Sequence, residues 1–127
     1  MDKIFFCIEY DFNNASPSFL WNHLTTPDGL ASWFADKVET NGKFFTFYWN
    51  DEKRIAKQTA LKSASHIKFR WKDEPDNKCY FEFKLEQNEI TKSTTLIISD
   101  HAYKNEIEDC IDLWNEQIAI LRKVLGA

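Results

Sequence analysis

Glycine, proline and long apolar runs are scarce in this chain. It has three glycines and three prolines among 127 residues, so few sharp turns are expected. No apolar run approaches the roughly 18 residues of a membrane-crossing helix. The apolar stretch at 4–8 is too short for a signal peptide, follows no basic region and ends at Glu9. We therefore expect a soluble, cytoplasmic protein without membrane insertion.

Excess positive charge is also missing. The chain has 16 basic and 20 acidic residues, a net charge of −4, which is the wrong sign for binding phosphate backbones, so nucleic acid is not an expected partner. Cys7, Cys79 and Cys110 are odd in number and far apart, a spacing that fits neither a disulfide framework nor a metal site. We expect reduced thiols, no metal and no other cofactor.

Aromatic residues are abundant, with 11 Phe, 5 Trp and 4 Tyr. The apolar fraction of 43% and the charged fraction of 28% are typical of a globular protein. The length suits one domain over residues 1–127. The composition thus predicts a single core with a broad aromatic interior.

The first third of the chain predicts a strand and two short helices. Residues 3–12 alternate between an apolar face and a mixed face, as a half-buried strand does. Ser-Pro at 16–17 and Thr-Pro at 26–27 are each an N-cap followed by a proline at the first helical position. The first helix would carry Phe19, Leu20 and Leu24, and the second would cover residues 27–34.

Period-two alternation then continues to residue 101 and predicts an antiparallel meander. The connections are short, and Asn41-Gly42 is one of them. Basic side chains of the strand after Ser65 are expected to pair with carboxylates of the next strand. The predicted strands are near 36–41, 43–50, 53–63, 66–72, 78–87 and 92–101.

After residue 101 the pattern changes to helical periodicity. Apolar residues recur at three- and four-residue steps, which predicts one amphipathic helix over 105–125. Asn105 and Glu108 are typical of a capping box, and Gly126 is a plausible stop. The apolar stripe consists of Ile107, Ile111, Trp114, Ile118, Leu121 and Leu125.

This order of elements predicts an α+β helix-grip fold, in which a curved antiparallel sheet of about seven strands wraps a long C-terminal helix, with two short helices after the first strand. The chain resembles START-like domains of the SRPBCC superfamily, especially heat-shock-ATPase-activator homologues. The resemblance includes residues 112–125 of the last helix. Its other matching positions are Trp21, Leu24, Thr25, Pro27, Leu30, Trp33 and Phe34.

The resemblance implies three classes of function. START-like proteins bind lipids or other apolar small molecules, some cyclise polyketides and some act as co-chaperones, and the fold does not choose among these. The leading hypothesis is non-catalytic binding of a hydrophobic small molecule or lipid. The alternatives are a co-chaperone-like interaction module with a filled core and a cyclase-like enzyme.

A ligand would lie between the sheet and the last helix. Either the aromatic side chains fill this space completely, or they leave an apolar cavity. Trp33 and Phe34 would form the cavity entrance, beside the turn at Asn50-Asp51, and no charged pair is expected inside, so the occupant would be neutral or weakly acidic. The predicted wall is Phe47, Trp49, Phe69, Trp71, Phe81, Phe83, Leu96, Ile98, Trp114 and Ile118.

No catalytic constellation stands out, and no catalytic residue is predicted. His23, His66 and His101 share no local spacing suited to metal binding or acid–base work. The charged strand residues Glu9, Lys57, Arg70 and Asp100 are expected at solvated or rim positions.

The outer face of the first strand carries apolar side chains. Alternation places Phe5 and Cys7 there, and Ile97 on the neighbouring strand would join them. Either the two short helices cover this patch or it forms a homodimer contact.

Overall fold

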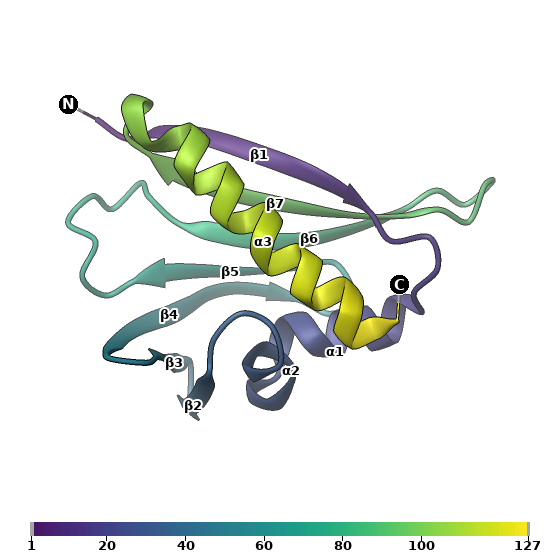
Figure 1. The fold of residues 1–127 in the computed structure, drawn as a ribbon, viewed down its shortest axis with the longest axis horizontal. Coiled ribbons are helices and arrows are strands. Elements are labelled where there is room, and N and C mark those ends of the chain that lie inside the picture. The colour runs from purple at the N-terminus through teal and green to yellow at the C-terminus, as the bar shows by residue number, and fades with distance from the viewer. Residues whose placement is uncertain (1, 127) are drawn as a thin grey trace.

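The computed structural model describes residues 2–126. Seven strands form one antiparallel sheet in the order β1-β7-β6-β5-β4-β3-β2, and the long helix α3 crosses one face of it (Figure 1). The strands are β1 (Ile4–Asp11), β2 (Lys37–Asn41), β3 (Phe44–Trp49), β4 (Glu52–Lys62), β5 (His66–Trp71), β6 (Phe81–Gln87) and β7 (Thr94–Ala102). The predicted α+β fold is confirmed.

Strand alternation sorts the side chains onto two faces, as expected. In β1, Ile8 and Tyr10 lie toward the core, and Ile8 pairs with Ile98 of β7. Cys7 is exposed on the opposite face, and Phe5 is half exposed. Because Phe5 and Cys7 remain exposed, the short helices do not cover this outer face.

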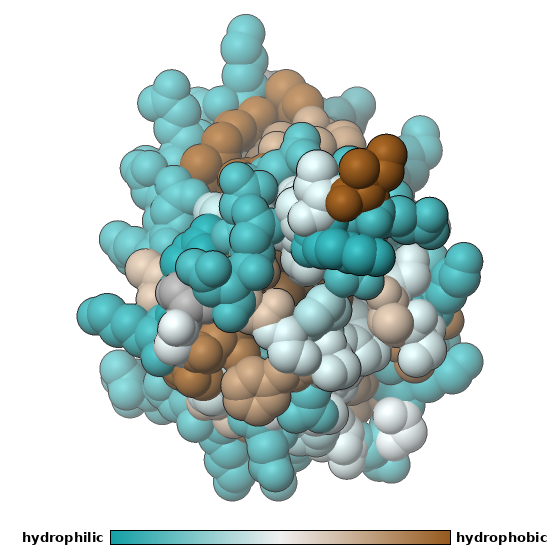
Figure 2. Space-filling view, turned by 90° about the vertical axis from the view of Figure 1, so that its right-hand side faces the viewer, coloured by the Kyte–Doolittle hydropathy of each residue, from teal (hydrophilic) through white to brown (hydrophobic). Residues whose placement is uncertain are grey.

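Two short helices follow β1. They are α1 (Pro17–Thr25) and α2 (Pro27–Ala31), and each begins with a proline as predicted. Thr26 caps α2 by accepting a hydrogen bond from the Gly29 backbone N at 3.0 Å. The two helices lie near the C-terminal end of α3 (Figure 1). Figure 2 faces this end of the molecule, where apolar side chains form separate patches among hydrophilic ones.

In α1, the buried face consists of Leu20, His23 and Leu24. Phe19 is half exposed and packs on the His23 ring, with the ring centroids 4.7 Å apart. The end of α2 differs from the prediction. Helix α2 ends at Ala31 rather than at residue 34. The chain turns there, and Trp33 and Phe34 both enter the core.

Helix α3 (Ile107–Leu125) buries the predicted apolar stripe through Trp114, Ile118 and Leu121. The predicted capping box is wrong, because a 3-10 turn, η1 (Lys104–Glu106), precedes the helix and its N-cap is Glu106. The predicted stop is confirmed, since Gly126 ends the helix in the left-handed region at φ 72°.

The deep interior is packed with aromatic rings. Phe34 lies at its centre, with ring centroids at 5.0 Å from Phe47, 5.8 Å from Phe81 and 5.7 Å from Trp114. Such packing fills the space between Phe34 and the sheet residues Phe47 and Phe81. Large side chains that are almost completely buried include Phe12, Phe47, Phe69, Phe81, Phe83, Leu20, Leu24, Leu30, Ile67, Leu96, Ile98 and Ile118.

The cross-strand ion pairs expected between β5 and β6 do not form. Lys68 lies over the Tyr80 ring, with its Nζ 4.1 Å from the centroid. Arg70 donates hydrogen bonds to the Glu74 backbone O and to the Asn77 Oδ1, and it thereby holds the loop between the two strands in place. The ion pairs among residues 2–126 are Lys3–Glu74, Arg54–Asp73 and Lys84–Glu86.

Candidate functional site

A cavity of about 450 Å³ lies between the first half of α3 and the sheet. Its lining includes residues that flank the β3–β4 turn and residues of the β5–β6 loop. These two connections lie at the end of the sheet opposite α1 (Figure 1). The lining residues are Lys3, Phe34, Trp49, Glu52, Arg54, Trp71, Glu74, Cys79, Tyr80, Asp100, His101, Cys110, Leu113, Trp114 and Gln117.

Phe34, Trp49, Trp71 and Trp114 form one aromatic wall of the lining. Phe34 stacks on Trp114 at 5.7 Å with an interplanar angle of 16°, and it meets Trp49 edge-on at 5.6 Å. The ring centroids of Trp71 and Trp49 lie 6.2 Å apart. The Trp49 Nε1 donates to the Phe34 backbone O at 2.8 Å, and Gln117 donates to the same oxygen at 3.1 Å. These hydrogen bonds fix the orientation of the wall.

Asp100 brings a carboxylate into this lining. It lies on β7, on the face that carries Leu96 and Ile98 toward α3. The Trp114 Nε1 donates to its Oδ2 at 3.0 Å, and the His101 backbone N donates to its Oδ1 at 2.7 Å. Burial raises the pKa of Asp100 although both hydrogen bonds oppose the shift. Asp100 is thus partly buried in the cavity lining and is not a fully solvated side chain.

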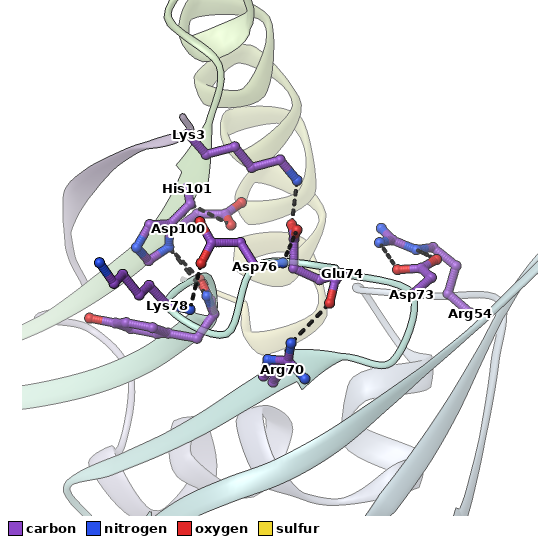
Figure 3. Close-up of polar contacts among 10 residues, drawn as sticks. Lys3, Arg54, Arg70, Asp73, Glu74, Asp76, Lys78, Asp100 and His101 are labelled. Atoms are coloured by element: carbon purple, nitrogen blue, oxygen red, sulfur yellow. Dashed lines mark hydrogen bonds and ion pairs between the residues drawn. The ribbon is translucent and has the colours of Figure 1, made fainter. Parts of the chain in front are cut away.

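Lys3 and Glu74 form an ion pair beside Asp100 (Figure 3). The Glu74 side chain is 7% exposed, and its Oε2 also accepts from the Asp76 backbone N at 3.1 Å. The hydrogen bond to Glu74 raises the pKa of Lys3. Burial alone would raise the pKa of Glu74, but the bonds from Lys3 and Asp76 outweigh it and lower this pKa. The pair joins the start of the chain to the β5–β6 loop.

A second ion pair lies over the aromatic wall. The Arg54 guanidinium stacks on Trp71, with Cζ 3.9 Å from the ring centroid. Two of its nitrogens donate to Asp73, at 2.8 and 3.1 Å. The hydrogen bond from Arg54 lowers the pKa of Asp73. With two ion pairs in or beside the lining, the expectation of an interior without charged pairs is wrong here.

Sequence reasoning missed Glu52 and Arg54 as lining residues. Arg54 pairs with Phe47, and Ala56 pairs with Phe45, so the start of β4 faces the interior. No apolar side chain at 52 or 54 signalled this, and only the register with β3 reveals it.

The predicted cavity residues fall into two groups. Trp49, Trp71 and Trp114 line the cavity, and so does Phe34, which was assigned to its entrance. Trp33 is 4% exposed and lies outside the lining, where its Nε1 donates to the His23 backbone O at 2.8 Å. The others lie in the core outside the cavity lining: Phe47, Phe69, Phe81, Phe83, Leu96, Ile98 and Ile118.

Between residues 2 and 126, no three His, Cys, Asp or Glu side chains gather where they could hold a metal ion. None of the helices over the same residues has the length and apolar character needed to span a bilayer.

A curved antiparallel sheet that grips a long C-terminal helix, with a cavity between them, defines a helix-grip domain. The chain belongs to the START-like superfamily, because the family model for a START-like superfamily domain matches residues 1–127. A comparison with curated proteins finds no match.

Solved structures agree with this assignment. The chain is 38% identical to the protein BfR322 of Bacteroides fragilis, covering 98% of this chain and 92% of that one, with a TM-score of 0.71. An Aha1 dimer of Colwellia psychrerythraea is 20% identical, with 96% of each chain covered and a TM-score of 0.79. MLL2253 of Mesorhizobium loti is 16% identical, with 97% of each chain covered and a TM-score of 0.77. The last two show likeness of fold alone.

Proposed function

We propose that this START-like domain binds a hydrophobic small molecule, without catalysis, in the cavity beside α3. The observation that carries the proposal is the aromatic wall of Phe34, Trp49, Trp71 and Trp114 around about 450 Å³ of space. Clefts of roughly 300–1,000 Å³ with apolar walls and a few polar groups are typical of small-molecule sites.

The packed core limits the size and shape of the ligand. Phe81 and Phe83 are 1% and 0% exposed, so the space does not extend between the sheet and the middle of α3. A ligand therefore occupies only the end of the domain near the β5–β6 loop. Flat aromatic compounds suit a wall of ring faces better than long acyl chains do.

A pair of cysteine variants tests the site. Cys110 is partly buried and lines the cavity, whereas Cys7 is exposed on the outer face of β1. We expect Cys110→Phe to fill the space and weaken binding of 2-naphthylmethanol about tenfold or more, as measured by calorimetry. Cys7→Phe adds the same side chain elsewhere and serves as the control. If circular dichroism shows that both variants are folded and they bind the probe with equal affinity, the cavity is not the binding site.

The packed interior and the uncovered outer face favour a second candidate, a protein-interaction module. Phe5 is 50% exposed, and its ring lies 5.4 Å from His101 and 6.2 Å from Tyr80 on that face. A homodimer through β1 is one form of this candidate. Sedimentation across a concentration series tests it, and Phe5→Ser should abolish any self-association. A monomer at every concentration would remove the homodimer.

A catalytic relay of side chains would need a second titratable group in contact with Asp100. Over residues 2–126, the hydrogen bonds to its carboxylate come from an indole and a backbone amide. Asp100 can therefore accept a hydrogen bond from a ligand. Neither of these two donors is a side chain that could exchange a proton with it. The cyclase-like alternative therefore gains no support from this geometry.

A further inference from the structure

Asp100 accepts a hydrogen bond from Trp114 and also lines the cavity. We infer that the ligand carries a protonated amine and that Asp100 receives it, an inference that rests on the proposed ligand-binding function. The ligand would then be a compact aromatic or aliphatic amine, whose apolar body lies against the tryptophans of the wall.

The charge balance of the lining is the first argument. Lys3 and Arg54 are the lysine and the arginine of the lining, and each is already paired, Lys3 with Glu74 and Arg54 with Asp73. The ring of His101, which also lines the cavity, bonds the Tyr80 backbone through Nδ1. Glu52 and Asp100 have no basic partner among the ion pairs of residues 2–126. The uncompensated charge of the cavity is thus negative, and it favours a cationic ligand over an anionic one.

The geometry around Asp100 is the second argument. Each of its two oxygens accepts one hydrogen bond, from Trp114 and from the His101 backbone. A carboxylate has about four acceptor sites, so about half of them remain available. Because Asp100 lines the cavity, a donor bound there can reach them. Lys3 lies beside Asp100 but its ammonium is bound to Glu74 (Figure 3).

The aromatic wall supplies the third argument. Indole faces attract cations, and Trp is the best of the aromatic side chains in this respect. Arg54 already uses one face of Trp71 in this way, at 3.9 Å. Trp114 presents its ring to the same cavity while its N–H bonds Asp100. An ammonium at Asp100 would therefore lie close to an indole.

Three probes with the same ring system test the inference: 2-naphthylmethylamine, 2-naphthylmethanol and 2-naphthoate, titrated by calorimetry at pH 7. We expect the amine to bind about tenfold or more tightly than the carboxylate, as one charge-assisted hydrogen bond implies. Asp100→Asn should lower the affinity for the amine about tenfold and change that for the alcohol less than threefold. Glu82→Gln is the control, because it removes the same charge from the outer face of β6.

The outcomes separate this inference from the proposed function. Equal binding of the three probes, a preference for the carboxylate or an amine preference that survives Asp100→Asn would overturn the inference and leave the binding function standing. Binding of none would overturn both. If Asp100→Asn fails to fold, the wild-type protein still decides, because the amine must shift the indole N–H resonance of Trp114 more than the alcohol does. Equal shifts would overturn the inference.

Discussion

Replacing Trp114 by alanine tests how α3 is held to the sheet. The indole is 6% exposed, and its ring lies 5.7 Å from Phe34, 5.9 Å from Phe83 and 6.3 Å from Phe81. Three aromatic neighbours would border the space left by the substitution, and they cannot collapse into it fully. The change also removes the hydrogen bond to Asp100.

The expected cost follows from these contacts. Removing a buried Trp typically lowers the free energy of unfolding by about 3–5 kcal/mol. Loss of the hydrogen bond to the partly buried carboxylate adds about 1 kcal/mol to this cost. The better helix propensity of alanine reduces it by a few tenths of a kcal/mol. We therefore expect Trp114→Ala to lower the free energy of unfolding by about 4–5 kcal/mol.

Urea unfolding at pH 7 measures this change. Leu113→Ala is the matched control, because Leu113 is the preceding residue of α3 and is 57% exposed. Its cost should stay below about 1 kcal/mol. Trp114→Phe keeps a ring but has no N–H donor, so it should fall between the two. A loss under about 1 kcal/mol for Trp114→Ala would refute the placement of the indole in the core.

Two further predictions concern Asp100 and Thr26. Burial raises the pKa of Asp100 above its usual value of 3.8, so the folded chain binds this proton more tightly than the unfolded chain. The free energy of unfolding of the wild-type protein should therefore fall, relative to that of Asp100→Asn, as the pH rises from below 3.8 through the raised pKa. Urea unfolding at several pH values over this range measures the difference between the two proteins. A difference in the free energy of unfolding that does not change with pH would contradict the raised pKa of Asp100. Thr26→Ala should cost about 1 kcal/mol by thermal unfolding, since Thr26 caps α2. Ser16→Ala is its control, because Ser16 makes no side-chain cap bond, and equal losses would contradict the cap.

Local patterns in the sequence were sufficient to predict the elements. Alternation and the three- and four-residue steps of 107–125 depend on neighbouring residues only, so the sheet and α3 could be predicted. The ends of helices were harder to predict. Helix α2 stops at Ala31 because Trp33 and Phe34 both pack into the core, which is a tertiary effect.

The cavity was only partly predictable. Trp49, Trp71 and Trp114 could be proposed from alternation and the helical stripe. Alternation also places Asp100 on the same face as Ile98, but a charged residue was expected to lie at the rim. The juxtaposition of Lys3 with Glu74 joins residues far apart in the sequence and depends on the curvature of the sheet, which no local pattern specifies.

The indole N–H signals of the five tryptophans provide the most direct test of ligand binding in this cavity. Trp49, Trp71 and Trp114 line it, whereas Trp21 and Trp33 do not. In ¹H–¹⁵N spectra of the wild-type protein titrated with 2-naphthylmethanol, we expect the three lining indoles to shift with a common dissociation constant while Trp21 and Trp33 stay in place. Unchanged signals for all five tryptophans, or shifts confined to Trp21 and Trp33, would contradict the proposed site.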